Sequence, residues 1–160
     1  MAHDYVLRTD GGSRSNPGPA GIGFTLEQRG EEAIGGGAFI GEATNNVAEY
    51  LAMAWGLENA VSSGVRKITV LADSELVVKQ LNGQYKVKNE GLKPYFLLVK
   101  SFFSRFDLIE VAHIYRAENK VADAYANAAM DERAEVGTAV VAFASSAGND
   151  VLNPPQTSLF

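Results

Sequence analysis

The chain has 160 residues, 46% of them hydrophobic, which is enough for one domain with a full core but not for two independent domains. It has no cysteine, which excludes disulfides and thiolate metal sites, and its polar start, Met-Ala-His-Asp, is unlike a signal peptide. We therefore expect a cytoplasmic protein with no membrane role. The formal net charge of −5 is unusual for a nucleic-acid binder, but it conceals a basic segment at residues 79–105, where Glu90 is the only acid.

The first third of the chain is predicted to form three strands and a helix. Residues 5–9, 21–30 and 31–43 have strand patterns, and a turn near Gly30 joins the last two into an antiparallel meander with the first. From Asn46 the apolar residues take helical spacing, until Ser62-Ser63-Gly64 ends the helix.

The remaining elements complete an α/β pattern. Residues 67–72, KITVLA, are apolar on both alternating faces, which indicates a covered strand in a parallel pairing. Helices are predicted at 74–81, 92–106 and 119–133, with a fifth strand at 108–115. The order βββαβααβα predicts an α/β fold: a five-stranded mixed sheet, three strands antiparallel and then two parallel, flanked by helices. Residues 1–133 are the expected domain, and residues 134–160 a C-terminal extension, first apolar and then flexible.

Four acidic residues stand at positions that suit either a ligand site or a local structural role. Asp10 ends the first strand before two glycines, or it forms a turn. Asp73 follows the central strand, or it caps the next helix. Glu49 begins a stripe of small and apolar residues at 49, 53, 56 and 60, or it forms a capping box with Asn46. Asp123 lies in the first turns of the last helix, where it also suits the helix dipole.

Considered together, these four acids indicate a metal site. Two follow strands that are expected to be neighbours, and two lie near the starts of helices that can pack beside those strand ends. Converging carboxylates repel one another unless a divalent cation neutralises them, and oxygen-only ligands favour Mg²⁺ or Mn²⁺ over Zn²⁺. Two such ions ~4 Å apart would activate a water and stabilise the leaving oxygen in phosphodiester hydrolysis.

Four blocks of sequence carry a family resemblance: DGGSRSNPGPAG, TNNVAEY, ADSELVVKQLNGQY and HIYRAENKVADAYANAAM. In their order and spacing they resemble type 1 ribonuclease H, over residues 4–132. The resemblance implies the five-stranded fold of that family and cleavage of the RNA strand of RNA–DNA hybrids, leaving 5′-phosphate and 3′-hydroxyl ends. It also implies two Mg²⁺ ions, replaceable by Mn²⁺, with the metal ligands Asp10, Glu49, Asp73 and Asp123.

The same resemblance implies contacts with the hybrid near its minor groove, where 2′-hydroxyls mark the RNA strand. The residues concerned are Gly11, Asn16, Asn45 and Gln80. Many members of the family have a loop histidine ten residues before the last aspartate. His113 has that offset but lies in a predicted strand, whereas Arg116 fits the variant R-x-x-N-x-x-A-D and lies nearer the loop. We favour Arg116 as the auxiliary group near the metals, with His113 as the alternative.

The long basic protrusion of some family members is reduced or absent, because only about ten residues separate the second and third predicted helices. Hybrid affinity would then depend on Lys79, Lys86 and Lys88, with Tyr85 as a stacking group; a solvated face is the alternative.

The chain ends in QTSLF, Gln156–Phe160, after Asn-Pro-Pro. This ending resembles the peptide by which bacterial replication proteins dock on the DNA polymerase sliding clamp; a disordered end is the alternative. Two other functions are alternatives: a binding module, which would lack carboxylates, and a DNA-directed nuclease of the same superfold, which would lack the first two blocks. We expect a monomer with no organic cofactor.

Overall fold

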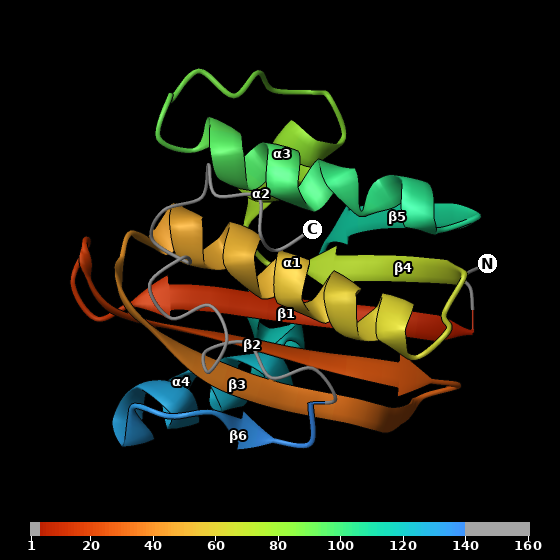
Figure 1. Ribbon diagram of the computed structural model, residues 1–160, viewed down its shortest axis with the longest axis horizontal. Coiled ribbons are helices and arrows are strands. Elements are labelled where there is room, and N and C mark those ends of the chain that lie inside the picture. Colours follow the sequence, from red (N-terminus) through yellow and green to blue (C-terminus); the bar gives the residue numbers. More distant parts are fainter. Residues whose placement is uncertain (1–3, 140–160) are drawn as a thin grey trace.

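The computed structural model describes residues 4–139 and shows a mixed six-stranded sheet between helices (Figure 1). The strands are β1 (Tyr5–Ser13), β2 (Gly18–Gln28), β3 (Glu31–Ala43), β4 (Lys67–Ala72), β5 (Leu108–His113) and β6 (Val136–Gly137). The helices are α1 (Asn45–Ser62), α2 (Glu75–Leu81), α3 (Lys93–Ser101) and α4 (Lys120–Glu132), with 3-10 turns η1 (Phe103–Arg105) and η2 (Arg116–Glu118). None of these described helices is long and apolar enough to cross a bilayer.

The sheet has the strand order β5-β4-β1-β2-β3-β6. β1, β2 and β3 are antiparallel neighbours, and β4 and β5 continue the sheet in parallel from β1, as predicted. The predicted count of five strands is wrong by one, because Val136 and Gly137 pair with β3 as a sixth strand. A two-residue strand is too short to show a hydrophobic period, so only the fold reveals it. The division of the chain at residue 133 remains a prediction.

Helices α1 and α4 cover opposite faces of the sheet (Figure 1). Alternation along β1 explains which side chain faces which helix: Leu7 packs against Gly56 of α1, whereas Asp10 pairs with Gly23, which lies under α4. The α1 face holds the larger core, in which Trp55 meets Phe24 edge to face at 5.0 Å and both are fully buried. Burying each such side chain contributes about 2 to 3 kcal/mol to folding.

Two glycines allow the helices to approach the sheet closely enough to form a site. A Cβ at Gly11 would overlap the carbonyl of Ala48 in α1, and a Cβ at Gly23 would overlap the carbonyl of Ala122 in α4. Both helices therefore lie directly on strand backbone near the end of β1.

Several predicted boundaries need correction. The first strand does not stop before Asp10: β1 continues to Ser13, pairing Asp10 with Gly23 and Ser13 with Ala20. The third helix runs from Lys93 only to Ser101, and the short turn η1 at Phe103–Arg105 follows it within the predicted range. The fifth strand ends at His113 rather than at residue 115. Residues 156–160 lie outside the described part of the chain.

Candidate active site

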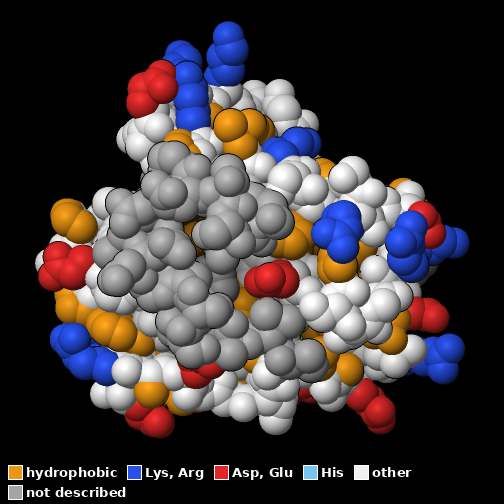
Figure 2. All heavy atoms as spheres, in the orientation of Figure 1, with side chains coloured by type: hydrophobic (Ala, Val, Ile, Leu, Met, Phe, Trp, Pro, Cys, Tyr) orange, Lys and Arg blue, Asp and Glu red, His pale blue; other side chains and the backbone are white. Residues whose placement is uncertain are grey.

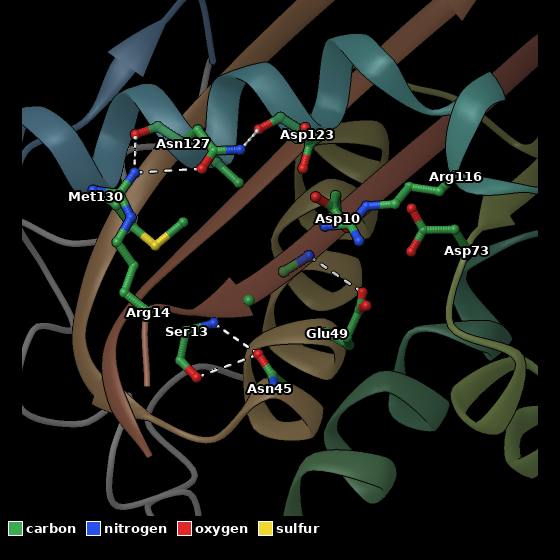
Figure 3. A pocket seen from close by; sticks show the side chains of 13 residues that line it. Asp10, Ser13, Arg14, Asn45, Glu49, Asp73, Arg116, Asp123, Asn127 and Met130 are labelled. Atoms are coloured by element: carbon green, nitrogen blue, oxygen red, sulfur yellow. Dashed lines mark hydrogen bonds between the residues drawn. The ribbon is translucent and has the colours of Figure 1, made fainter. Parts of the chain in front are cut away.

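All four predicted acids line one cavity of about 400 Å³ (Figure 3). Its walls come from β1, the start of α1, the end of β4, η2 and one face of α4. The lining residues are Asp10, Gly11, Gly12, Ser13, Arg14, Asn45, Glu49, Asp73, Arg116, Asp123, Ala126, Asn127 and Met130. One carboxylate oxygen from each of Asp10, Glu49 and Asp73 lies within 4.8 Å of the others, and all three residues are half-buried. The structure thus brings together groups that are up to 113 positions apart in the sequence.

The parallel pairing of β1 with β4 places the first two acids side by side. The register of this pairing ends with Thr9 opposite Ala72, so the residues that follow these two along the sequence are Asp10 and Asp73. Asp10 remains in β1 because that strand is still paired with β2, whereas Asp73 leads out of β4 toward α2.

Glu49 reaches the same place from the first turns of α1. Thr44 caps this helix by accepting a hydrogen bond from the N–H of Val47, so the alternative role of Glu49, a capping box with Asn46, is not formed. The Glu49 carboxylate instead accepts a hydrogen bond from the N–H of Gly11 at 3.2 Å. The predicted stripe behind it is confirmed, since Met53, Gly56 and Ala60 are buried toward the sheet.

The alternative role considered for Asp73 is also filled by a neighbour. Ser74 caps α2 by accepting from the N–H of Val77, which leaves the Asp73 carboxylate directed into the cavity. Asp123 lies in the first turn of α4, where its own N–H donates to the carbonyl of Asn119 at 3.1 Å.

Burial and mutual repulsion make two of these acids hard to ionise. The pKa of Asp10 is raised from 3.8 to about 8, first by burial, then by the charge of Asp73 and by hydrogen bonding and charge from Asp123. The pKa of Glu49 is raised well above its ordinary value by burial and by the charges of Asp10 and Asp73. Arg116 opposes both shifts. A cation in the cavity would therefore displace protons from these carboxyl groups.

Arg116 and His113 are placed differently. Arg116 projects from η2 into the cavity and points toward Asp10 and Asp73 (Figure 3). His113 is the last residue of β5, opposite Ala72; it is exposed, packs its ring edge to face against Tyr115 at 5.6 Å, and does not line the cavity. The prediction of a strand position for His113 is confirmed.

The predicted substrate contacts fall into separate places. Gly11 and Asn45 line the acidic cavity, and Asn45 also lines a neighbouring cavity of about 440 Å³ together with Asn16. The Asn16 side chain accepts from the N–H of Asn45 at 3.0 Å, and the Asn45 side chain accepts from the N–H of Ser13 at 2.9 Å. We call this second cavity the asparagine groove; its other lining residues are Thr44, Asn46, Val47, Asn89, Gly91 and Leu92.

Gln80 does not lie with the other predicted contacts. Its side chain is buried and accepts a hydrogen bond from the hydroxyl of Tyr50, and its contact with a substrate stays a prediction. Gln80 lines a third cavity of about 380 Å³, which we call the lysine groove. The lining residues of this groove are Gln80, Gly83, Tyr85, Lys86, Val87, Lys93, Phe96 and Leu97.

Basic side chains surround the lysine groove. Lys79 lies over the Tyr85 ring, 5.0 Å from its centre, and Lys88 is exposed nearby in the α2–α3 connection. Figure 2 shows Lys and Arg side chains over this connection, at the top of the view. The arrangement suits an anionic, partly stacked ligand.

Sequence reasoning missed two residues of this region. Arg14 lines the cavity, forms an ion pair with Asp131 at 2.7 Å, and donates to the side chain and carbonyl of Asn127. Asn119 lies behind the cavity and donates to Asp73 at 3.2 Å. Both residues lie inside the sequence blocks quoted above, Asn119 as the asparagine of R-x-x-N-x-x-A-D. The motifs therefore include them but do not indicate which residues they contact.

The chain matches the family described as Reverse transcriptase-like over residues 8–129. It is 41% identical over 136 residues to the bifunctional protein Rv2228c of Mycobacterium tuberculosis. The aligned region covers 84% of this chain and 37% of that protein. The chain thus spans little more than a third of the length of that relative.

Two shorter relatives are covered more fully. Ribonuclease HI of Halobacterium salinarum is 41% identical over 124 residues, covering 77% of this chain and 62% of that protein. The crystal structure of LC11-RNase H1 in complex with an RNA/DNA hybrid is 39% identical and superimposes with a TM-score of 0.77, covering 81% of this chain and 98% of that one. Both the fold and the sequence of this chain are therefore similar to those of ribonucleases H.

Proposed function

Because the chain belongs to the Reverse transcriptase-like family and is similar in sequence and fold to the ribonucleases H described above, we propose that it is an endoribonuclease that hydrolyses the RNA strand of RNA–DNA hybrids. The observation that carries the proposal is the convergence of four carboxylates in one open cavity beside a polar groove. Residues 1–133 are proposed as the catalytic unit, and the products as 5′-phosphate and 3′-hydroxyl ends.

The acidic cavity fits hard divalent cations. The four acids offer only oxygen ligands, and burial and the neighbouring charges raise the pKa of Asp10, so a counter-charge would favour ionisation of the group. We propose that Asp10, Glu49, Asp73 and Asp123 hold two Mg²⁺ ions, with Mn²⁺ as a substitute. Cations held there supply an activated attacking water and stabilise charge on the leaving oxygen.

The remaining residues of the cavity would orient the substrate. Arg116 is the cation nearest the carboxylates, so it is placed to meet a phosphate oxygen of the strand being cut. Asn45 lines both the acidic cavity and the asparagine groove, which gives the RNA strand a continuous polar path past Gly11 and Asn16. Amide side chains both donate and accept, as recognition of a 2′-hydroxyl requires.

The DNA strand would lie along the lysine groove. Lys86 lines this groove, and Lys88 stands beside it, so both can meet backbone phosphates while Tyr85 offers a ring for stacking. Concentrating the basic charge here explains how a chain of net charge −5 can bind a polyanion.

The test uses labelled RNA–DNA hybrid, double-stranded RNA and double-stranded DNA, each with and without Mg²⁺. The wild-type chain is compared with Asp10→Asn and with Asp107→Asn, a change of an exposed acid that pairs with Arg66 far from the cavity. We expect cutting of hybrid RNA only, dependent on Mg²⁺, lost in Asp10→Asn and kept in Asp107→Asn. Cleavage of duplex DNA instead would favour the DNA-directed nuclease, and binding without cleavage the binding module.

A second proposal concerns the chain end. The sequence of Gln156–Phe160 supports docking on a bacterial sliding clamp, although these residues lie outside the described part of the chain. The test is surface-immobilised clamp against the whole chain and a chain ending at residue 155; equal binding of the two would refute the proposal.

We also propose that the protein works as a cytoplasmic monomer. Support for the cytoplasm comes from the absence of cysteine, because disulfides mark oxidising compartments. Light scattering after size-exclusion chromatography, and cell fractionation, test the two parts separately.

A further inference from the structure

Asn119 is a buried polar residue at the junction of the acid-bearing elements. It directly precedes α4 and has no exposed surface. Its side-chain Nδ2 donates to the backbone carbonyl of Thr9 at 2.8 Å and to Oδ2 of Asp73 at 3.2 Å. Because both partners are acceptors, only the NH₂ end of the amide can face them, and the orientation of the side chain is fixed.

The backbone of Asn119 adds two further links. Its N–H donates to the carbonyl of Arg116 at 3.0 Å, and its carbonyl accepts from the N–H of Asp123 at 3.1 Å. Asn119 therefore forms hydrogen bonds with Arg116, Asp73 and Asp123, and with Thr9, the residue before Asp10. Yet Asn119 does not itself line the acidic cavity.

The asparagine is not the choice that stability alone would make. Its Oδ1 is buried and has no hydrogen-bond partner among the described residues. An unsatisfied buried acceptor destabilises the folded state, and an apolar side chain of the same branching, leucine, has no such acceptor. The benefit of the asparagine must lie in its donor, which faces Thr9 and Asp73.

We propose that Asn119 is a positioning residue for the metal site. Its NH₂ group holds the Asp73 carboxylate and the end of the β1–β4 pairing, so that Asp73 and Asp10 present their oxygens to a shared cation. The inference rests on the function proposed above, because it assumes that these carboxylates bind divalent cations. Partners that orient metal-binding carboxylates typically change metal affinity by 10- to 100-fold when removed.

The experiment compares Asn119→Ala and Asn119→Leu with the matched control Asn59→Ala in the full chain. Asn59 is also fully buried, and its Nδ2 donates to the carbonyl of Trp55 at 3.0 Å within α1, away from the cavity. Three quantities are measured: the melting temperature, the affinity for Mg²⁺ by calorimetry without nucleic acid, and kcat and KM on labelled hybrid over a range of Mg²⁺ concentrations.

We expect both Asn119 variants to bind Mg²⁺ 10- to 100-fold more weakly, with a lower kcat that rises again at high Mg²⁺ and a KM for hybrid within about twofold of wild type. Asn119→Leu should melt above Asn119→Ala, because the longer side chain leaves no cavity at this buried position. Asn59→Ala should lower the melting temperature and leave Mg²⁺ affinity unchanged.

Wild-type affinity for Mg²⁺ in Asn119→Leu would overturn the inference, because that variant fills the site but lacks the NH₂ group that donates to Thr9 and Asp73. An equal loss of affinity in Asn59→Ala would overturn it as well, since the effect would then follow general destabilisation. If wild type itself neither binds Mg²⁺ nor cleaves hybrid, the proposed function fails, and this inference with it; wild-type binding and cleavage with unaffected Asn119 variants would remove this inference alone.

Discussion

Replacing Asp10 by asparagine should make the metal-free protein more stable at neutral pH while abolishing cleavage. Asn keeps the shape of Asp10 but removes its charge from a cavity that also contains Asp73 and Asp123. In the folded protein the pKa of Asp10 is about 8, against 3.8 for the ordinary group. The unfolded chain therefore releases this proton at a much lower pH than the folded protein does.

The sign and size of the effect follow from proton linkage. A raised native pKa means that the folded state gives most stability below pH ~4 and loses it as the pH rises toward about 8. At pH 7 the loss has an upper limit of about 1.36 × (7 − 3.8), or ~4 kcal/mol. Water reaches the open cavity and neighbouring acids can take up protons instead, so we expect about 2 kcal/mol.

The assay is thermal and urea unfolding without divalent cations, followed by circular dichroism at pH 4, 5.5, 7 and 8. A gain of about 2 kcal/mol corresponds to a melting temperature about 4 to 8 °C higher in Asp10→Asn at pH 7, shrinking to almost nothing at pH 4. Asp107→Asn is the control of opposite sign, because Arg66 lowers the pKa of Asp107. Added Mg²⁺ should stabilise wild type more than Asp10→Asn.

Equal stability of wild type and Asp10→Asn at pH 7 would refute the reasoning, and so would a gain that does not change with pH. Either result would mean that burial and the neighbouring carboxylates do not raise the pKa of Asp10 in the folded protein. Loss of cleavage alone would not rescue the argument, because a local structural change could also cause it.

Three further predictions concern packing, catalysis and binding. Gly11→Ala should lower the free energy of unfolding in urea by about 3 kcal/mol, because the new Cβ overlaps the backbone of α1; a change below about 0.5 kcal/mol would contradict the close packing. Arg116→Ala should reduce kcat on hybrid by about tenfold, or ~1.4 kcal/mol, while His113→Ala keeps wild-type kcat; the reverse order would make His113 the auxiliary group. The double change of Lys86 and Lys88 to Ala should raise KM for hybrid and leave kcat unchanged. The slope of log binding constant against log salt concentration should become shallower by about 0.7 to 0.9 per lysine, and an unchanged slope would exclude the lysine groove as the path of a nucleic-acid strand.

The order of elements could be predicted from the sequence because each long element has a clear hydrophobic period. β3 and β4 match their predicted ranges, since their residues alternate or are buried on both faces. The extension of β1 past Asp10 could not be predicted, because glycines and serine have little intrinsic preference for strands. They are extended here because β2 supplies hydrogen-bonding partners as far as Ala20.

The candidate site was predictable in its acids but not in the residues that hold them. For Glu49 and Asp73, the local sequence allows both a cap and a ligand, and the choice depends on Thr44 and Ser74, which take the capping roles instead. Gln80 shows the opposite limit: its hydrogen bond to Tyr50 spans 30 positions, and no local pattern distinguishes it from an exposed glutamine.

The repulsion within the cavity is a consequence of backbone packing rather than of side-chain choice alone. Gly11 lets α1 lie on β1, and its N–H then binds Glu49, so the contact that closes the core on one face also brings this carboxylate toward Asp10. Gly23 does the same for α4 and Asp123 on the other face. The acids cannot separate without opening both helix contacts. Repulsion among these acids therefore lowers the stability of the whole fold. A cation that neutralises them stabilises the folded protein and completes the site in the same binding event.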